Sequence, residues 1–284
     1  MSLLPLVRRS TFATGLQSPR LAAPDRGAAQ TVLALGLVPL VSVSREFFDA
    51  MGTEPPMPDG VVDCGDPSEP NLEVIRKMNV DLIVTSTITA DIRNVLGRVA
   101  AVHALQIYTG LPDTLERAKT ETLKLAAEIG RTEACQNYLR AQANLLELSH
   151  SKLSSWKRRP VYLIGLAPDG RNMTVYGRNS LMWDVMIRLG VENAWHGETN
   201  VFGFANAGIE RLADQPDAAI VSIDYGAITQ SAFATLAQSP FWVRLPAVQA
   251  HRVYSIKRFE VFGGLPAATQ FAPLLTDVLL STAI

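Results

Sequence analysis

The sequence has few of the residues and motifs that catalysis or metal binding requires. Its 284 residues include four histidines and two cysteines. No two histidines fall within one helical turn and no Cys-x-x-Cys pair occurs, so a zinc site is unsupported. The nucleophile elbow Gly-x-Ser-x-Gly, the Walker phosphate loop and the dinucleotide motif Gly-x-Gly-x-x-Gly are also missing. Without a nucleophile, a base and an orienting group, the sequence predicts a protein that is not an enzyme.

An excess of one charge and a long apolar run are missing as well. The formal net charge is −1, which gives no electrostatic basis for a nucleic-acid partner. No apolar stretch reaches the roughly 18 residues of a membrane-spanning helix. With 48% hydrophobic and 19% charged residues, the composition is that of a globular protein. Cys64 and Cys135 are expected to be buried thiols, the alternative being a disulfide between them.

The sequence does contain one pattern that occurs in both halves. Residues 69–86 read EPNLEVIRKMNVDLIVTS, and residues 209–224 read IERLADQPDAAIVSID. Each predicts a short amphipathic helix, a tight turn and a buried strand, with Asp81 before the first strand and Asp217 before the second. One such unit in each half favours two α/β lobes, and a cleft between two lobes can bind a ligand.

A long helix is expected between the two halves, over residues 132–156. About 25 residues make a rod near 37 Å. Its apolar face is predicted to consist of Ala134, Tyr138, Ala141, Leu145 and Leu148, flanked by Leu139, Leu146 and Leu153. The helix either joins the two lobes or is an ordinary packed helix.

The expected domain organisation follows from these elements. Residues 1–19 are a remnant of an export signal or a disordered segment, 20–130 the N-terminal α/β lobe, 131–158 the interlobe helix and 159–284 the C-terminal α/β lobe. The first segment contains Arg8-Arg9 before Ser-Thr-Phe, as in a twin-arginine signal. Polar residues interrupt the apolar region of about 7–15 residues that should follow.

Polar and aromatic residues gather in the loops after the predicted strands. In open α/β sheets ligands bind at the carboxyl ends of the strands, and these loops fall there in both halves. Packing within a lobe is the alternative for several of them, Trp195 in particular. The candidate ligand-binding residues are Thr85, Thr87, Thr89, Trp195, Asn200, Phe202, Phe204, Tyr225, Phe259 and Phe262.

The segments VLALGLVPL, EPPMPD, EPNLE, GRNSLMWDV, NAWHGETN and IERLA occur in this order around the long helix. In the order of these segments, the chain from Arg20 to the C-terminus resembles the ferric-hydroxamate siderophore-binding proteins of bacterial ABC importers. These are class III periplasmic binding proteins. The resemblance implies two α/β lobes joined by a single long α-helix, with a shallow aromatic-lined cleft. It also implies a periplasmic monomer that needs no cofactor, because iron is carried within the siderophore.

The chain departs from this family at several cleft positions. The arginine that contacts the hydroxamates falls at Pro67, and a cleft tyrosine falls at Thr89. A cleft tryptophan falls at Phe202, and an aromatic residue after the first strand falls at Arg26. One arginine is therefore lost and one is gained. We hypothesise that Arg26 supplies the missing cation, the alternative being a solvated loop residue.

The resemblance also implies two acidic residues, one on each lobe, that dock to arginines of the permease. Glu210 matches the position on the second lobe. The first-lobe position falls at Asn94, and Asp91 lies one turn earlier. A helix N-terminus also favours a carboxylate, so Glu210 can serve the helix dipole as well as docking.

The function predicted from sequence is binding of a ferric siderophore, of hydroxamate type, and its delivery to an ABC permease for iron uptake. The protein would meet the inner membrane only through that permease. The alternatives are a binding protein for another large chelate, namely a carboxylate or mixed siderophore, haem or a corrinoid. A paralogue without a transport function is a further alternative, and the interrupted signal is its support.

Overall fold

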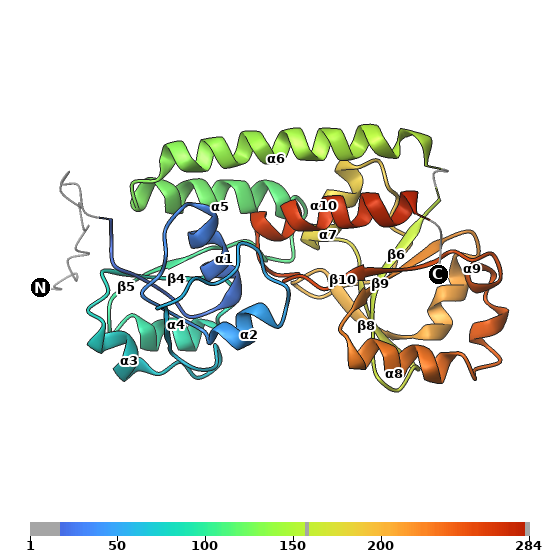
Figure 1. Cartoon of the computed structure of the whole chain (residues 1–284), viewed down its shortest axis with the longest axis horizontal. Coiled ribbons are helices and arrows are strands. Elements are labelled where there is room, and N and C mark those ends of the chain that lie inside the picture. Colours follow the sequence, from blue (N-terminus) through green and yellow to red (C-terminus); the bar gives the residue numbers. More distant parts are fainter. Residues whose placement is uncertain (1–17, 157–158, 282–284) are drawn as a thin grey trace, which may run out of the picture.

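Two five-stranded sheets, one in each half of the chain, are bridged by the long helix α6 (Figure 1). The computed structural model describes residues 18–156 and 159–281. The predicted signal at Arg8-Arg9 lies outside the described residues. None of the helices within the described ranges is long and apolar enough to cross a membrane.

The N-terminal sheet is entirely parallel, with the strand order β3-β2-β1-β4-β5. Its central strand β1 is followed directly by α1, and β4 is buried throughout. The carboxyl ends of β1 and β4 therefore lie side by side. The strands are β1 (Leu21–Ala23), β2 (Val41–Ser42), β3 (Val62–Asp63), β4 (Leu82–Thr85) and β5 (Ala101–Ala104). The helices are α1 (Arg26–Ala34), α2 (Arg45–Asp49), α3 (Leu72–Lys77) and α4 (Ala90–Leu96).

The C-terminal sheet is mixed, with the order β10-β9-β6-β7-β8. Strands β10, β9 and β6 are parallel, whereas β7 is antiparallel to both of its neighbours. The strands are β6 (Val161–Leu166), β7 (Asn172–Tyr176), β8 (Phe204–Gly208), β9 (Ala219–Asp224) and β10 (Val253–Lys257). The helices are α7 (Leu181–Arg188), α8 (Ala227–Leu236) and α9 (Pro246–Gln249), with 3-10 turns at Ile209–Asp214 and Trp242–Arg244.

The repeated unit is less regular than the sequence predicts. Its first copy contains the α-helix α3, but its second copy contains only the 3-10 helix Ile209–Asp214 before β9. Pro216 follows two residues later, and the residue before a proline avoids the α conformation. The second helix therefore has no room to extend.

Helix α6 (Thr132–Lys152) has 21 residues, about 31 Å, and continues as a 3-10 turn at Leu153–Ser155. The predicted apolar face is wrong, since Leu148 is 62% exposed. The buried stripe is the one that includes Leu146 and Leu153, together with polar Gln142. Gln142 donates to the Leu265 carbonyl at 3.0 Å.

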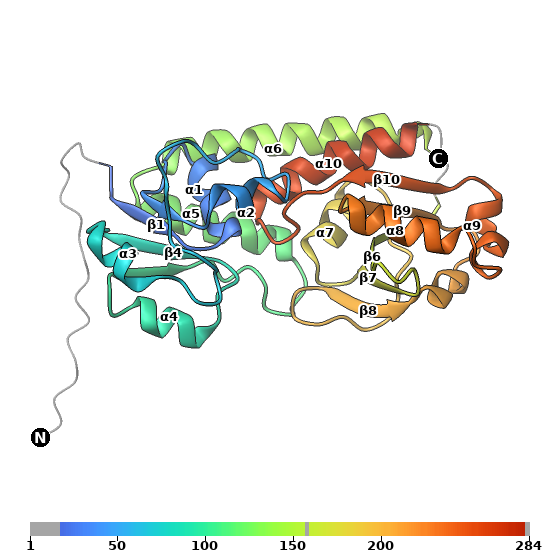
Figure 2. The same ribbon diagram turned by 60° about the horizontal axis from the view of Figure 1, so that its bottom comes forward.

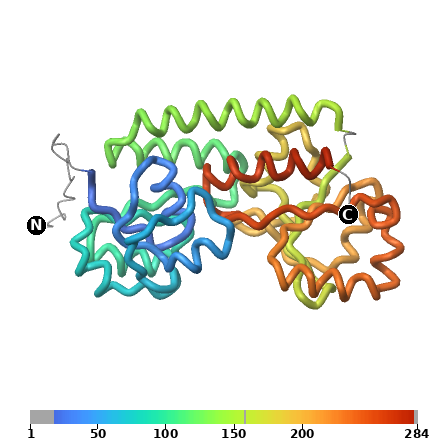
Figure 3. Tube along the Cα trace, in the orientation of Figure 1, coloured from blue at the N-terminus to red at the C-terminus, as the bar shows by residue number. Residues whose placement is uncertain are grey.

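Helices α5 (Thr114–Glu128) and α10 (Leu265–Leu280) pack beside α6 (Figures 1 and 2). Tyr138 of α6 bonds to Thr269 of α10 with 2.8 Å between the hydroxyl oxygens. These three helices form a layer along one side of both lobes, traced in Figure 3.

Both cysteines are free and buried, as expected, and burial raises the pKa of Cys64 to about 12.

The start of α5 is fixed by α7 of the other lobe. The Leu115 amide donates to Asp184 at 2.9 Å, and Thr114 donates to the Asn179 carbonyl at 2.8 Å. The Asn179 side chain donates to the Gly110 carbonyl at 2.8 Å. Burial raises the pKa of Asp184, although the Leu115 amide opposes that shift. A helix end that is capped by the opposite lobe restricts movement between the lobes.

Candidate ligand-binding cleft

Aromatic side chains from both lobes meet between the two sheets, and we call them the interlobe aromatic cluster. Phe262 is at the centre, with ring centroids 5.6 Å from Tyr108, 5.4 Å from Phe202 and 6.0 Å from Phe204. Tyr108 follows β5 of the N-terminal lobe, whereas Phe204 opens β8 of the C-terminal lobe. The cluster is Tyr108, Tyr176, Phe202, Phe204, Tyr225 and Phe262.

A tight turn presents Phe202 and Phe204. The Asn200 side-chain oxygen accepts from the amides of Phe202 at 3.0 Å and Phe204 at 3.3 Å. Gly203, at φ +79°, donates its amide to the Asn200 carbonyl at 2.9 Å. Asn200 was expected to contact the ligand, but in this structure its side-chain oxygen orders the turn.

Two tyrosines complete the wall on the C-terminal lobe. Tyr225 follows β9, and its side chain is hydrogen-bonded to that of Tyr176. Burial raises the pKa of both tyrosines, so their hydroxyls are neutral at physiological pH. A Cβ on Gly165 of β6 would lie 3.0 Å from the Tyr225 ring, so a glycine there lets the ring lie across the strand.

The positively charged residue that sequence predicted at the cleft is Arg26, the first residue of α1. Its Nε donates to the carboxylate of Glu260, and the guanidinium carbon lies 4.1 Å from the centre of the Phe47 ring. The Asp25 carboxylate caps α1 by accepting from the amides of Ala28 and Ser86, each at 2.8 Å. Since Ser86 follows β4, this cap joins the ends of two neighbouring strands and fixes the direction in which Arg26 leaves the sheet.

Several predicted site residues lie elsewhere. Trp195 is 5% exposed and packs in the core of the C-terminal lobe. Phe259 is fully buried and stacks on Phe271 of α10 with centroids 5.5 Å apart. Thr85 is 1% exposed inside its lobe. These three side chains pack within the protein and do not face the cleft.

The other threonines of the first lobe lie in the loop from β4 to α4. Thr87 is half-buried, and Thr89 is exposed at the N-cap of α4 without a side-chain cap bond. Sequence reasoning missed Tyr108, Tyr176 and Glu260. Tyr108 could have been found because it is an aromatic residue at the end of a predicted strand, residues 104–108, whereas Glu260 gave no local signal.

The two predicted docking acids are both exposed. Asp91 lies in the first turn of α4, and Glu210 follows β8. Figure 2 shows α4 and β8 along the same side of the molecule, one on each lobe.

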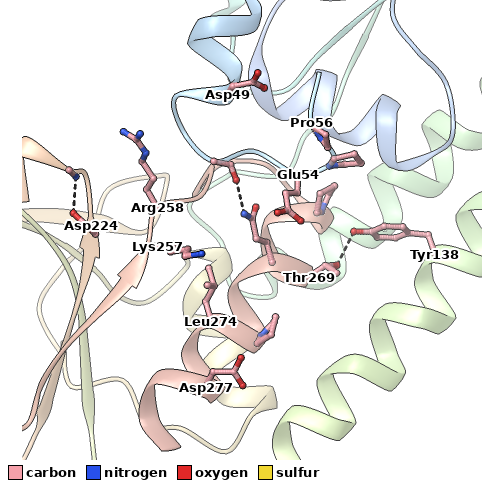
Figure 4. A pocket seen from close by; sticks show the side chains of 16 residues that line it. Asp49, Glu54, Pro56, Tyr138, Asp224, Lys257, Arg258, Thr269, Leu274 and Asp277 are labelled. Carbon is pink, nitrogen blue, oxygen red and sulfur yellow. Dashed lines mark hydrogen bonds between the residues drawn. The ribbon is translucent and has the colours of Figure 1, made fainter. Parts of the chain in front are cut away.

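A separate hollow of about 970 Å³ lies on the α10 side of the lobe junction (Figure 4). Its lining combines charged side chains, such as Arg258 and Asp277, with several prolines and Leu274, and includes none of the predicted ligand-binding residues. A second hollow, of about 710 Å³, lies beside Trp183 and His196. Neither hollow is lined by a ring of the aromatic cluster. We place the site at the cluster, because it combines the strand ends, both lobes and the cation.

No group of three or more His, Cys, Asp or Glu side chains that could hold a metal ion occurs within residues 18–156 and 159–281. A cleft of this composition can enclose an apolar ligand between rings and offer it donors from Arg26 and the tyrosines.

Comparison with known proteins agrees with this architecture. Residues 27–258 match the family profile described as periplasmic binding protein. The iron(3+)-hydroxamate-binding protein FhuD of Escherichia coli K12 is 27% identical over 281 residues, covering 98% of this chain and 94% of that one.

Solved structures share the fold. The siderophore-binding protein FhuD of Vibrio cholerae, crystallised with Fe3+-Desferal, has a TM-score of 0.85 and 24% identity, over 94% of this chain and all of that one. The triscatecholate siderophore-binding protein FeuA of Bacillus subtilis, with ferri-bacillibactin, has a TM-score of 0.72 and 16% identity, over 94% of each chain. With two α/β lobes, a single bridging helix and a profile match across most of its length, the chain belongs to the periplasmic binding protein family, with the class III architecture.

Proposed function

We propose that this protein binds a ferric siderophore of hydroxamate type and does not transform it. The supporting observation is the interlobe aromatic cluster, to which the guanidinium of Arg26 is linked through Glu260 and the Phe262 amide. A ferric trihydroxamate has an apolar periphery that aromatic walls can bury, and hydroxamate oxygens that an arginine can hydrogen-bond. The two FhuD relatives, one an iron(3+)-hydroxamate-binding protein and the other bound to Fe3+-Desferal, point to the same ligand class.

Calorimetric titration of the purified protein tests this proposal. We expect a ferric trihydroxamate to bind at micromolar concentration or below, and the metal-free siderophore to bind more weakly. Calorimetry suits this protein because no tryptophan belongs to the cluster, so quenching is an indirect signal. Ferric carboxylate siderophores, haem and a corrinoid serve as comparators. If one of these bound and the trihydroxamate did not, the proposed ligand class would be wrong.

We further propose that the protein acts in the periplasm and delivers its ligand to an ABC permease through the face that carries Glu210 and Asp91. Exchanging Glu210 for alanine is expected to lower siderophore-dependent iron uptake about tenfold while ligand affinity stays unchanged, because Glu210 lies outside the aromatic cluster. Glu147 of α6, exposed on the helical layer, provides the matched control variant Glu147→Ala. Uptake equal to wild type in Glu210→Ala would argue against docking at this face.

A further inference from the structure

A buried carboxylate lies beside the interlobe aromatic cluster. The Glu260 side chain is 4% exposed, although it lies in the loop between β10 and α10. One carboxylate oxygen accepts from Arg26 Nε, and the other accepts from the Phe262 amide at 3.2 Å. The two charged residues are 234 positions apart in the sequence. An ion pair that is buried on the acidic side therefore joins the start of α1 to the loop that carries Phe262 of the aromatic cluster.

The field of Glu260 reaches the walls of the cleft. Burial raises the pKa of Tyr108, Tyr176 and Tyr225, and the negative charge of Glu260 raises each of them further. The carboxylate thus lies close to tyrosines that come from both lobes. A ligand that rests on these rings also lies within its electrostatic reach.

The ion pair leaves part of Arg26 available. Glu260 accepts from Nε alone, and within the described residues neither terminal nitrogen of Arg26 donates a hydrogen bond. The Phe47 ring covers the guanidinium on one side at 4.1 Å. The N–H groups of both terminal nitrogens of Arg26 can therefore donate hydrogen bonds to a ligand while its charge is already balanced.

The charges near the cleft do not favour an anion. Two negatively charged residues lie near the positive Arg26. They are Glu260 and, on the exposed loop after β3, Asp66. Hydrogen bonds from Ser68 lower the pKa of Asp66, and the charge of Arg26 lowers it further, so Asp66 is ionised. Asp25 is fully buried at the base of α1, where burial raises its pKa.

From this geometry we propose that Glu260 is a specificity-determining residue, which cancels the charge of Arg26 and makes the cleft select ferric chelates without net negative charge. Three singly charged hydroxamates balance the ferric ion, whereas three doubly charged catecholates leave a strongly anionic complex. The neutral chelate can still accept hydrogen bonds from Arg26, but an anionic chelate loses its hydration on binding and gains no net attraction from a balanced ion pair. This inference rests on the proposed function and names the charge class of its ligand.

The test uses one chelate core with different tail charges. Ferric desferrioxamine B with its free amine is cationic, its N-acetyl derivative is neutral and its N-succinyl derivative is anionic. Calorimetry of the wild type is expected to show the anionic complex binding about fivefold more weakly than the neutral one. In Glu260→Gln that ratio is expected to disappear or reverse. A structural role alone would weaken all three complexes equally and leave the ratio unchanged.

Controls separate local charge from net charge and from folding. Asp217→Asn makes the same change in net charge at an 89% exposed side chain before β9, at the amino end of that strand and not at the carboxyl ends that face the site, and should keep the wild-type ratio. Arg26→Gln should widen the ratio, and the double variant Arg26→Gln/Glu260→Gln should restore it, because the cleft is neutral again. A thermal melt shows whether Glu260→Gln folds. If it does not fold, the ratios measured with Arg26→Gln and with the double variant test the inference in its place.

The outcomes are distinct. An unchanged ratio in folded Glu260→Gln, or a ratio in Arg26→Gln equal to that of the wild type, overturns the inference while the proposed function stands. Failure of all three complexes to bind the wild type overturns the proposed function, and the inference with it.

Discussion

Replacing Phe262 with alanine is expected to lower the affinity for the ferric ligand about a hundredfold, or about 2.7 kcal/mol. Phe262 is the ring that meets Tyr108, Phe202 and Phe204, so it joins the walls of the two lobes. An aromatic side chain at the centre of an interface buries about 150–250 Å², and such anchors typically contribute 2 kcal/mol or more.

The measurement is calorimetric titration with the complex that binds the wild type best. Phe241→Ala is the matched control, because Phe241 is 39% exposed and belongs to the segment before the 3-10 turn Trp242–Arg244. It should leave affinity within a factor of two. A loss of less than threefold in Phe262→Ala, with an unchanged melting temperature, would place the ligand away from the cluster.

Replacing Gly203 with alanine is expected to have the largest effect on folding. Gly203 has φ +79°, and its carbonyl accepts from the Gly177 amide at 2.9 Å. An added Cβ would lie only 2.5 Å from the Asn179 carbonyl carbon and closer still to the Ser180 backbone. Backbone atoms cannot rotate away as a side chain can, so we expect a loss of about 3–5 kcal/mol in the free energy of unfolding.

The same substitution should remove ligand binding, because the turn presents Phe202 and Phe204. Gly36→Ala isolates the cost of the backbone conformation: its φ is +75° but nothing lies within 4 Å of the added Cβ. That control should lose only about 1 kcal/mol and bind normally. Chemical denaturation and calorimetry check both, and equal losses in the two variants would contradict the steric argument.

The repeated unit shows where local pattern is reliable. Strands β4 and β9 lie where the apolar runs after Asp81 and Asp217 predicted them. A continuous apolar run is typical of a strand in a parallel sheet, because such a strand is buried on both faces of the sheet. The helix before β9 was overestimated because Pro216 limits it. The face of α6 was misjudged for another reason. Gln142 is buried because a backbone carbonyl of α10 accepts its hydrogen bond, and that partner cannot be read from the periodicity of α6.

The cleft shows the same division between local and distant causes. Phe259 and Phe262 are three positions apart in one loop, yet one stacks on α10 and the other joins the aromatic cluster. Loops have no period that assigns side chains to a face, so sequence predicted both as cleft residues. Trp195 turned inward because Gly177 and Gly197 leave space for its ring.

By itself, the sequence determined the two α/β halves, the long helix between them and the placement of aromatic residues after strands, because these follow from short-range patterns of polarity. Only the tertiary structure decided which rings meet across the lobes, and that Arg26, taken from sequence as a free cation, pairs with Glu260. That pairing depends on how α1 and the loop before α10 approach each other. Such contacts are set by the packing of whole lobes, and no residue near Arg26 in the chain reports them.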